Sequence, residues 1–430
     1  MARGLDTVAG CACYRLRSCC RTPALDFRRT SGMNTPEDHE PRAPRPDTDA
    51  SQIRRRPRSR RRPVPAGLPL TKQREFSPPR ALRNGQVQTM IGNLPFIQWL
   101  TRRRGLALLA NAREWLLDCG DGVRLQGFLS LTRGNGGAKE MTVDAAESRI
   151  ALILHGWEGS AESCYVVSLG AQLVANGFDV LRLNLRDHGE SHHLNREIFH
   201  SCRLTEVVGA TRAVAERFPS AKIFLAGFSL GGNFALRVSA AAGAPAAIVG
   251  AVAISPVLDP AVTLEALERG WSLYRRYFVR RWSRSLRRKR RAWPDLPDFE
   301  SVLRTQDLRS MTEGLVRQFT DFASLESYLD GYAITGPRLS SLRFPAAILL
   351  AEDDPMVPAA DLARLSRSPL LTVLRTRHGG HCGFMEQLNG PSFADQFVVA
   401  QFERIARDAA SVSSNPEYSP TGTSRPPTRA

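Results

Sequence analysis

The sequence predicts an α/β fold with a mostly parallel, eight-stranded sheet and helices on both of its faces. Two observations lead to this prediction. Short apolar runs of strand length alternate with helix-like segments over most of the chain, which is the rhythm of βαβ units. In addition, the glycine-rich turn Gly227–Gly232 stands between a strand-like run and a helix-like run. With 430 residues, the chain can hold one large α/β domain with appendages.

The expected strands begin with a hairpin made by residues 115–119 and 123–129, which Gly120-Asp121-Gly122 divides. The further strands are expected near residues 150–154, 179–183, 222–226, 248–254, 346–351 and 370–374. The interval after the strand at 248–254 is much longer than a normal crossover connection. Residues of about 256–340 are therefore expected to form an inserted helical cap.

The two ends of the chain differ in composition from the part between them. Residues 1–70 are rich in Arg, Pro, Ser and Thr and show no periodicity, so they are expected to form a disordered basic arm. Residues 409–430 are rich in Ser and Pro and are expected to form a disordered tail. The folded domain is expected to span residues 71–408. Met33 is an alternative start, which would leave residues 1–32 untranslated.

The turn at Gly227–Gly232 has the composition of a nucleophile elbow, in which a serine is raised above the carboxyl edge of a parallel sheet. A serine on so sharp a turn has strained backbone angles, and the residues two positions to either side must have almost no side chain. Gly227 and Gly231 meet that requirement around Ser229. Ser229 is therefore the candidate nucleophile, in preference to an ordinary residue of a glycine-rich turn.

A serine needs a base to remove its proton, and the base is oriented by a carboxylate. In this architecture the acid and then the histidine follow the serine along the chain. Asp354 stands in the turn after the strand at 346–351 and is the preferred acid, with Asp353 as the alternative. His381 lies among small residues in the loop after the last strand and is the preferred base, with His378 as the alternative.

The oxygen that becomes negative during acyl transfer needs two backbone N–H donors. One is expected from Leu230, directly after the candidate nucleophile, and the other from Trp157, in the loop after the third strand. His155 and Gly156 are expected to support that loop, with Gly156 permitting the required backbone orientation. The loop at 184–191 is expected to buttress it through hydrogen bonds.

Five stretches make the chain resemble the YheT-like branch of the α/β hydrolases, a group that includes eukaryotic membrane-anchored phospholipases and esterases. They are Phe76–Thr89, His155–Ser160, Gly227–Gly232, Asp353–Pro355 and Gly379–His381. The resemblance implies an α/β-hydrolase fold and an activity on carboxyl esters, in many relatives those of acyl lipids. Three features depart from the pattern of the branch. Gln86 stands where a histidine is common, and Trp157 stands where leucine or isoleucine is usual. The loop Asp187-His188-Gly189 is closer to general lipases than to the arginine-glycine form of the branch.

The formal net charge is +17, and the excess lies in the N-terminal segment and in the stretch Arg275–Arg291. That stretch holds ten basic residues and no acidic one. Tyr274, directly before it, and Tyr277, Phe278 and Trp282 within it occur at near-helical spacing. One interpretation is a helix that lies on an anionic membrane with its aromatic residues buried in the interface. The equally weighted alternative is a helix whose apolar stripe packs on the body of the protein. Specific binding of nucleic acid is not expected, because no folded basic groove with interleaved aromatic residues is evident.

The sequence contains no window of eighteen apolar residues, and its start lacks the apolar core of a signal peptide. Four of the eight cysteines crowd into the first twenty residues, and the other four are scattered, as is usual in a reducing compartment. No motif for a metal, nucleotide or redox cofactor is found, so no cofactor is expected. These features predict a cytoplasmic protein, with peripheral association at a membrane through the basic stretch.

Together these residues predict a serine hydrolase that cleaves carboxyl esters through an acyl-enzyme. Ser229 would attack the ester, His381 would transfer the proton, and Asp354 would orient the histidine. Two alternatives remain open at this point. One is an acyltransferase that uses the same three residues, and the other is a binding or scaffold protein in which they are idle.

Overall fold

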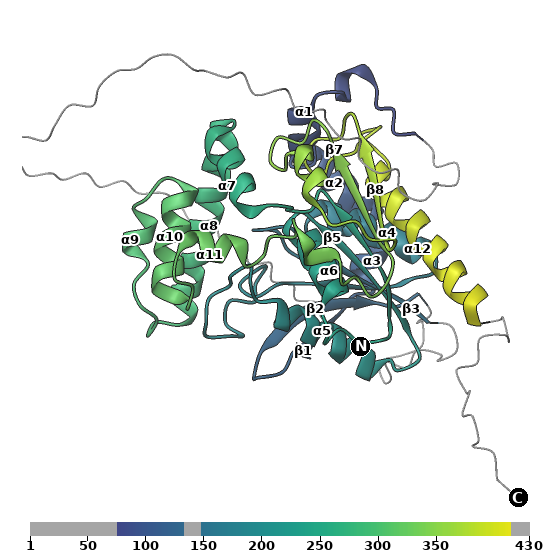
Figure 1. The fold of residues 1–430 in the computed structure, drawn as a ribbon, viewed down its shortest axis with the longest axis horizontal. Helices are drawn as coiled ribbons and strands as arrows, with labels where there is room; N and C mark the ends of the chain where they lie inside the picture. Colours follow the sequence, from purple (N-terminus) through teal and green to yellow (C-terminus); the bar gives the residue numbers. More distant parts are fainter. Residues whose placement is uncertain (1–74, 133–147, 414–430) are drawn as a thin grey trace, which may run out of the picture. The chain divides into compact units, whose positions relative to one another are not determined.

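An eight-stranded sheet forms the centre of the protein (Figure 1). The computed structural model describes residues 75–132 and 148–413. The strands lie in the order β1-β2-β4-β3-β5-β6-β7-β8, with β2 antiparallel to both of its neighbours and all other pairs parallel. This arrangement confirms the predicted α/β fold.

The strands lie within two residues of the predicted positions at every boundary. They are Arg113–Asp118 (β1), Arg124–Ser130 (β2), Arg149–Leu154 (β3), Asp179–Leu183 (β4), Lys222–Phe228 (β5), Ile248–Ile254 (β6), Ala346–Ala351 (β7) and Leu371–Thr376 (β8). The interior strands are almost wholly buried, as the pattern of β7 shows at all six of its positions. Helices cover both sides of such strands, which is why continuous apolar runs predict them well.

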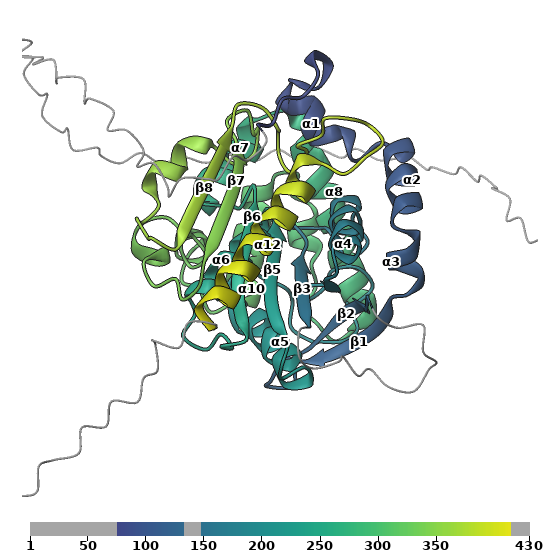
Figure 2. The same cartoon turned by 90° about the vertical axis from the view of Figure 1, so that its right-hand side faces the viewer.

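Helices pack on both faces of the sheet, as Figure 2 shows for α12 and α4 on one of them. On that face lie α3 (Leu106–Ala110), α4 (Cys164–Ala175) and α12 (Phe393–Ser413). The opposite face is covered by α5 (Leu204–Arg217) and α6 (Leu230–Ala240). The described chain begins before the sheet with η1 (Arg80–Leu82), α1 (Gly85–Ile91) and α2 (Pro95–Arg104). The connection between β7 and β8 contains the 3-10 helix η3 (Ala359–Arg364).

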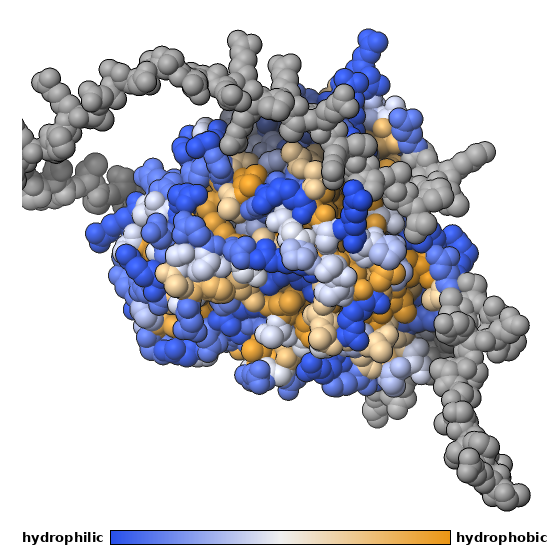
Figure 3. Space-filling model, viewed as in Figure 1, coloured by the Kyte–Doolittle hydropathy of each residue, from blue (hydrophilic) through white to orange (hydrophobic). Residues whose placement is uncertain are grey.

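The stretch between β6 and β7 forms a helical layer beside the sheet (Figure 1). It contains α7 (Pro260–Arg269), α8 (Ser272–Ala292), α9 (Glu300–Leu303), α10 (Leu308–Phe319), α11 (Leu325–Asp330) and the 3-10 helix η2 (Pro337–Leu339). We call α7 to α11 the cap helices. They have apolar clusters of their own, and apolar side chains also show at the surface between these helices and the sheet (Figure 3).

The predicted N-terminal arm, residues 1–70, lies outside the described residues, as do residues 414–430 of the predicted tail. The first residues of that tail, 409–413, are helical instead, because α12 continues to Ser413. Within the described ranges, none of the helices combines the length and the apolar character that crossing a bilayer requires.

The strand register brings the loops that carry the candidate residues to one edge of the sheet. Leu154, the last residue of β3, pairs with Gly227 at the end of β5. Ala351 and Thr376, the last residues of β7 and β8, also pair with each other. All four strands are parallel, so the loops that follow them leave the same edge, where open α/β sheets bind their ligands.

A buried ion pair fastens α8 to the loop that follows β4. The Lys289 ammonium group donates to Asp187 Oδ1 at 2.8 Å, and the two side chains are 1% and 8% exposed. Lys289 also donates to the backbone carbonyl groups of His192 and Asn195. Burial raises the pKa of Asp187 to about 6, although the ammonium group of Lys289 opposes that shift. The pair therefore holds the end of α8 in a fixed position on the body.

We expect Lys289→Met to lower the free energy of unfolding by about 3–5 kcal/mol, because it leaves the buried Asp187 carboxylate without its cation. Equilibrium unfolding in urea measures this change. Arg288→Gln is the matched control, since Arg288 is paired with Glu190 at 2.9 Å at the surface, and the loss of such a pair costs less than about 1 kcal/mol. Equal stability of the two variants would show that the buried pair does not anchor the helix.

Candidate active site

Ser229 occupies the sharp turn between β5 and α6. Its φ of 52° and ψ of −116° are values that a residue with a side chain rarely adopts. A Cβ atom at Gly227 would lie 2.2 Å from the carbonyl oxygen of Gly231, and one at Gly231 would lie 2.3 Å from the carbonyl oxygen of Leu154. Both positions therefore require glycine, for the steric reason on which the sequence prediction rests.

Asp354 and His381 face each other at the ends of β7 and β8. The distance from His381 Nδ1 to Asp354 Oδ2 is 2.9 Å, and the Asp354 side chain is fully buried. Asp354 Oδ1 accepts hydrogen bonds from the backbone N–H groups of Met356 and Val357, both at 2.9 Å. These bonds fix the carboxylate, so that its second oxygen is directed at the imidazole.

The neighbouring acid, Asp353, has different partners. Its Oδ1 accepts from the backbone N–H of Gly380 at 2.8 Å, and its Oδ2 lies 3.6 Å from Nδ1 of His378. The two adjacent aspartates thus contact two different histidines. Asp354 is paired with the preferred base, whereas Asp353 supports the start of the loop that carries it.

Helix α1 contacts the loop that carries His381 and supports it. The sequence did not indicate this contact. The backbone N–H of His381 donates to Thr89 Oγ1 at 2.9 Å, and that hydroxyl donates in turn to the carbonyl of Gly85. The buried Gln88 amide accepts from the backbone N–H of Met385 and donates to its carbonyl. Because Gln88 and Thr89 are almost 300 residues from the loop along the chain, spacing alone gave no signal for these contacts.

His155 shapes the loop after β3. Its Nε2 accepts from the backbone N–H of Leu185 at 3.1 Å, so the ring proton is on Nδ1, which donates to the carbonyl of Gly156 at 2.7 Å. Burial, with His188 beside it, lowers the pKa of His155 well below its ordinary value, so the ring is neutral. The contact with Leu185 is a buttress of the kind that the sequence predicts for the loop at 184–191.

The backbone N–H of Trp157 points away from the His155 ring. A trans peptide directs its C=O and N–H groups in opposite directions, and the carbonyl of Gly156 accepts bonds from His155 and from the N–H of Gly159. The loop also lies against the elbow, since a Cβ atom at Gly156 would lie 3.2 Å from Ser229 Cβ. Among the described residues, the N–H of Trp157 has no acceptor.

Leu230 begins helix α6, and its backbone N–H is among the N–H groups that a helix start leaves without a partner inside the helix. The Ser229 side chain does not cap this end. Two N–H groups, those of Trp157 and Leu230, thus lie close to the elbow without acceptors in the described part of the chain.

A cavity of about 480 Å³ joins these groups. Its lining includes Ser229, His381, Trp157 and Leu230, together with many aromatic and aliphatic side chains of the cap helices. The structure gives no hydrogen bond between the Ser229 hydroxyl and His381. Catalytic hydrogen bonds are often long in ligand-free enzymes and shorten when substrate binds.

The side chain of Trp157 is held between two rings of α8. It stacks on Phe278 with a centroid distance of 5.1 Å and an interplanar angle of 9°. It meets Trp282 edge-on at 5.0 Å. Tyr274, one turn before Phe278, is buried and contacts Gln86, the residue that departs from the family pattern. Tyr274, Phe278 and Trp282 therefore pack on the body of the protein, in agreement with the second interpretation of this helix, whereas Tyr277 is exposed.

Burial changes the pKa of one carboxyl group that lines the cavity, that of Glu158. Burial raises the pKa of Glu158, next to Trp157, to about 7, although Arg281 opposes the shift. This carboxyl group is therefore less ionised near neutral pH than an exposed glutamate would be. Four cysteines of the described residues are free thiols, and no cluster of three metal-ligating side chains occurs in that part of the chain. The cysteines of the first twenty residues lie outside it.

Comparison with known proteins places this geometry in a family. The family model described as "alpha/beta hydrolase fold" matches residues 152–388, more than half of the chain. The chain belongs to the alpha/beta hydrolase family. Its fold, its strand order and its resemblance to the YheT-like branch agree with this assignment.

Named relatives of this hydrolase include a bacterial and a mammalian protein. It is 26% identical over 319 residues to the esterase-named protein YheT of Escherichia coli, with 72% of this chain and 87% of that protein covered. It is 23% identical over 303 residues to phospholipase ABHD3 of Mus musculus, with 67% and 72% covered. Among solved structures, a serine hydrolase of Cycloclasticus zankles has a TM-score of 0.45 and 16% identity, with 68% of this chain and 98% of that chain covered.

Proposed function

We propose that this hydrolase cleaves carboxyl esters through an acyl-enzyme formed on Ser229. His381 takes the proton of the Ser229 hydroxyl as its oxygen attacks the carbonyl carbon, and then gives that proton to the departing alcohol. Water attacks the resulting acyl-enzyme, with His381 again acting as the base, and the acid is released. Asp354 keeps the proton of the neutral imidazole on Nδ1, so that Nε2 is free to accept.

The two free N–H groups beside the elbow have a separate role in this proposal. The carbonyl oxygen becomes negative when Ser229 attacks, and the N–H groups of Trp157 and Leu230 stabilise it. Each such donor is typically worth about 3 kcal/mol of the barrier. His155 supports this role, because its bond to the carbonyl of Gly156 orients the peptide that carries one of the donors.

The observation that carries the proposal is the pair of Asp354 and His381, because the imidazole of this pair lines the cavity that holds the elbow serine. The 2.9 Å contact joins loops that follow two neighbouring strands, and His381 lines the same cavity as Ser229. A protein that used this cavity only for binding would have no need of a buried carboxylate directed at a histidine. The pairing therefore favours catalysis over an idle scaffold.

The cavity supports an acyl-lipid ester as the substrate class. Apolar and aromatic side chains of α7, α8 and α11, such as Leu264, Phe278 and Tyr328, form much of its lining and suit a hydrocarbon chain. The similarity to a protein named phospholipase points to the same class. Peripheral contact with an anionic membrane through Arg275–Arg291 belongs to this proposal, since lipid esters are held in membranes.

The proposal is tested with p-nitrophenyl esters graded in chain length. The purified full chain is expected to release one acid and one alcohol per ester cleaved, with kcat/KM rising from acetate to longer acyl chains. Product analysis with added glycerol distinguishes an acyltransferase, which would form a new ester in place of the free acid. Absence of turnover on the whole panel would contradict the proposal.

We expect kcat/KM to fall at acid pH, with a midpoint above pH 6.5. Burial alone would lower the pKa of His381, but the Asp354 carboxylate raises it well above the ordinary value. The base must be neutral, so activity is lost as the pH falls through this pKa. In Asp354→Asn the raising charge is gone, and the midpoint of the remaining activity should move to lower pH. An identical midpoint in both proteins would mean that His381 is not the titrating base.

A further inference from the structure

Helix α8 has two faces with different surroundings. One face is turned to the body, where Phe278 and Trp282 pack on Trp157 and Lys289 pairs with Asp187. The opposite face carries five exposed arginines at intervals of four, four, three and four residues, which places them in one row along the helix. We call this row the arginine stripe: Arg276, Arg280, Arg284, Arg287 and Arg291.

The arginine stripe is not neutralised by carboxylates within the described residues. The ion pairs of this helix are made by neighbouring side chains instead, namely Arg275 with Glu268, Arg288 with Glu190, and the buried Lys289. Five positive charges along about 22 Å of helix form a surface that attracts an extended anionic partner. A single small anion would not engage the whole row.

Apolar side chains extend the same face at the start of the helix. Leu273 precedes the arginine stripe on this face and is 40% exposed, and Tyr277 is 36% exposed. Trp271, just before the helix, is 50% exposed. Tyr277 also lines the cavity that holds Ser229, so this apolar end of the arginine stripe adjoins that cavity.

Helix α2 contributes a similar group of residues to the same cavity. Its Ile97 and Thr101 line the cavity, while Phe96 and Trp99 are 61% and 53% exposed and stack on each other at 6.2 Å. The Arg103 guanidinium lies 5.5 Å from the centre of the Trp99 ring. Exposed aromatic side chains beside arginines thus come from two helices that line one cavity.

We propose that the arginine stripe, with Trp271 and Leu273, docks on an anionic lipid bilayer so that the cavity receives its substrate from that surface. This inference assigns particular residues to the peripheral membrane contact of the proposed function, and it rests on the proposed ester hydrolysis for the delivery of substrate. Arginine binds anionic headgroups, and Trp, Tyr and Leu suit the boundary between headgroups and acyl chains. A nucleic acid or an acidic protein would use the arginines but would leave these exposed apolar residues without a role.

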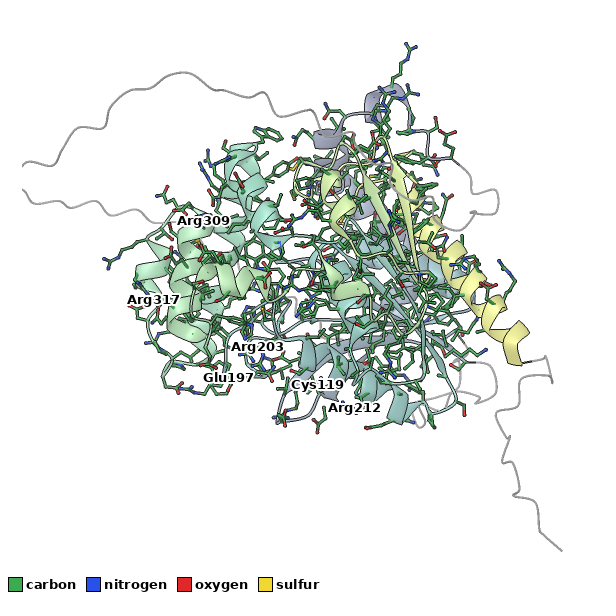
Figure 4. The ribbon with its side chains drawn as sticks, in the orientation of Figure 1. Cys119, Glu197, Arg203, Arg212, Arg309 and Arg317 are labelled. Atoms are coloured by element: carbon green, nitrogen blue, oxygen red, sulfur yellow. The ribbon has the colours of Figure 1, made fainter. Side chains whose placement is uncertain are left out.

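The test uses the Ser229→Ala full chain, so that binding is measured without turnover. The triple variant Arg280→Gln, Arg284→Gln, Arg287→Gln is expected to bind vesicles of phosphatidylcholine with 30% phosphatidylserine roughly a hundredfold more weakly in a sedimentation assay. The matched control replaces three exposed arginines of α5 and α10, labelled in Figure 4, with glutamine: Arg212, Arg309 and Arg317. The control removes the same total charge and is expected to retain binding.

A second variant separates a bilayer from other anionic partners. Trp271→Ser with Leu273→Ser is expected to weaken binding to the vesicles at least about fivefold, while binding to soluble polyglutamate stays unchanged. Equal losses in the stripe and control triples would overturn the proposal, and so would unchanged vesicle binding in the serine variant. In a background with Ser229 intact, the stripe variant should hydrolyse a soluble short-chain ester at the normal rate, so failure of docking and failure of the hydrolase proposal are distinguishable.

Discussion

Ser229→Ala is expected to lower kcat for a short-chain p-nitrophenyl ester by about six orders of magnitude. Without the hydroxyl no acyl-enzyme forms, and the remaining groups act only on direct attack by water. The elbow itself should remain, because an alanine keeps the short side chain that the strained turn tolerates. The measurement is the initial rate of p-nitrophenol release, with the circular dichroism spectrum as the check on folding.

Ser163→Ala is the matched control for this prediction. Ser163 lines the same cavity, and its hydroxyl accepts from the backbone N–H of Ser160 at 3.0 Å, but it follows a different strand and has no elbow. Its loss should change kcat by less than about tenfold. If the Ser229 variant retained more than a trace of activity while folded, another residue would have to be the nucleophile.

Asp354→Asn is expected to lower kcat by about ten thousandfold. The amide can still accept from Met356 and Val357 through its oxygen, so the loop should keep its shape. Its NH₂ group, however, would face His381 Nδ1 and favour the tautomer with the proton on Nε2. An imidazole in that tautomer cannot take the proton of Ser229.

Asp353→Asn is the matched control for Asp354→Asn, because it makes the same chemical change at the adjacent position. The new side chain can keep the bond to the N–H of Gly380, and the lost contact with His378 is 3.6 Å long. We expect a decrease in kcat of less than about tenfold. Reversal of the order, with the larger loss at position 353, would contradict the proposed roles of the two aspartates.

The sequence predicts the fold well because the apolar residues of a buried strand are visible in the sequence itself. Continuous apolar runs occur where helices cover both sides of a strand, and the eight strands lie within two residues of the expected positions. The glycines of the elbow are equally local, since Gly227 and Gly231 are required by atoms a few residues away and by the end of the neighbouring strand. Chain order then leads to candidate partners for Ser229.

Contacts between distant segments could not be predicted in the same way. The sequence leaves Asp353 as an alternative to Asp354, and the contact of Asp354 with His381 at 2.9 Å distinguishes the two aspartates in the structure. The aromatic spacing in α8 predicts an apolar face. Spacing alone cannot show whether that face contacts a membrane or another part of the protein, such as Trp157. The support of His381 by Thr89 joins residues 292 positions apart. The roles of Ser229, Asp354, His381 and the two N–H donors stay predictions until they are tested.

The most direct test of the central claim is the site of covalent labelling by a fluorophosphonate. The reagent modifies a serine whose proton is removed by a nearby base, so it reports activation of the oxygen rather than exposure. Mass spectrometry of tryptic peptides is expected to place a single adduct on Ser229, at full occupancy in the native protein and at trace level in His381→Ala. An adduct at another serine, or labelling of Ser229 that does not depend on His381, would contradict the account.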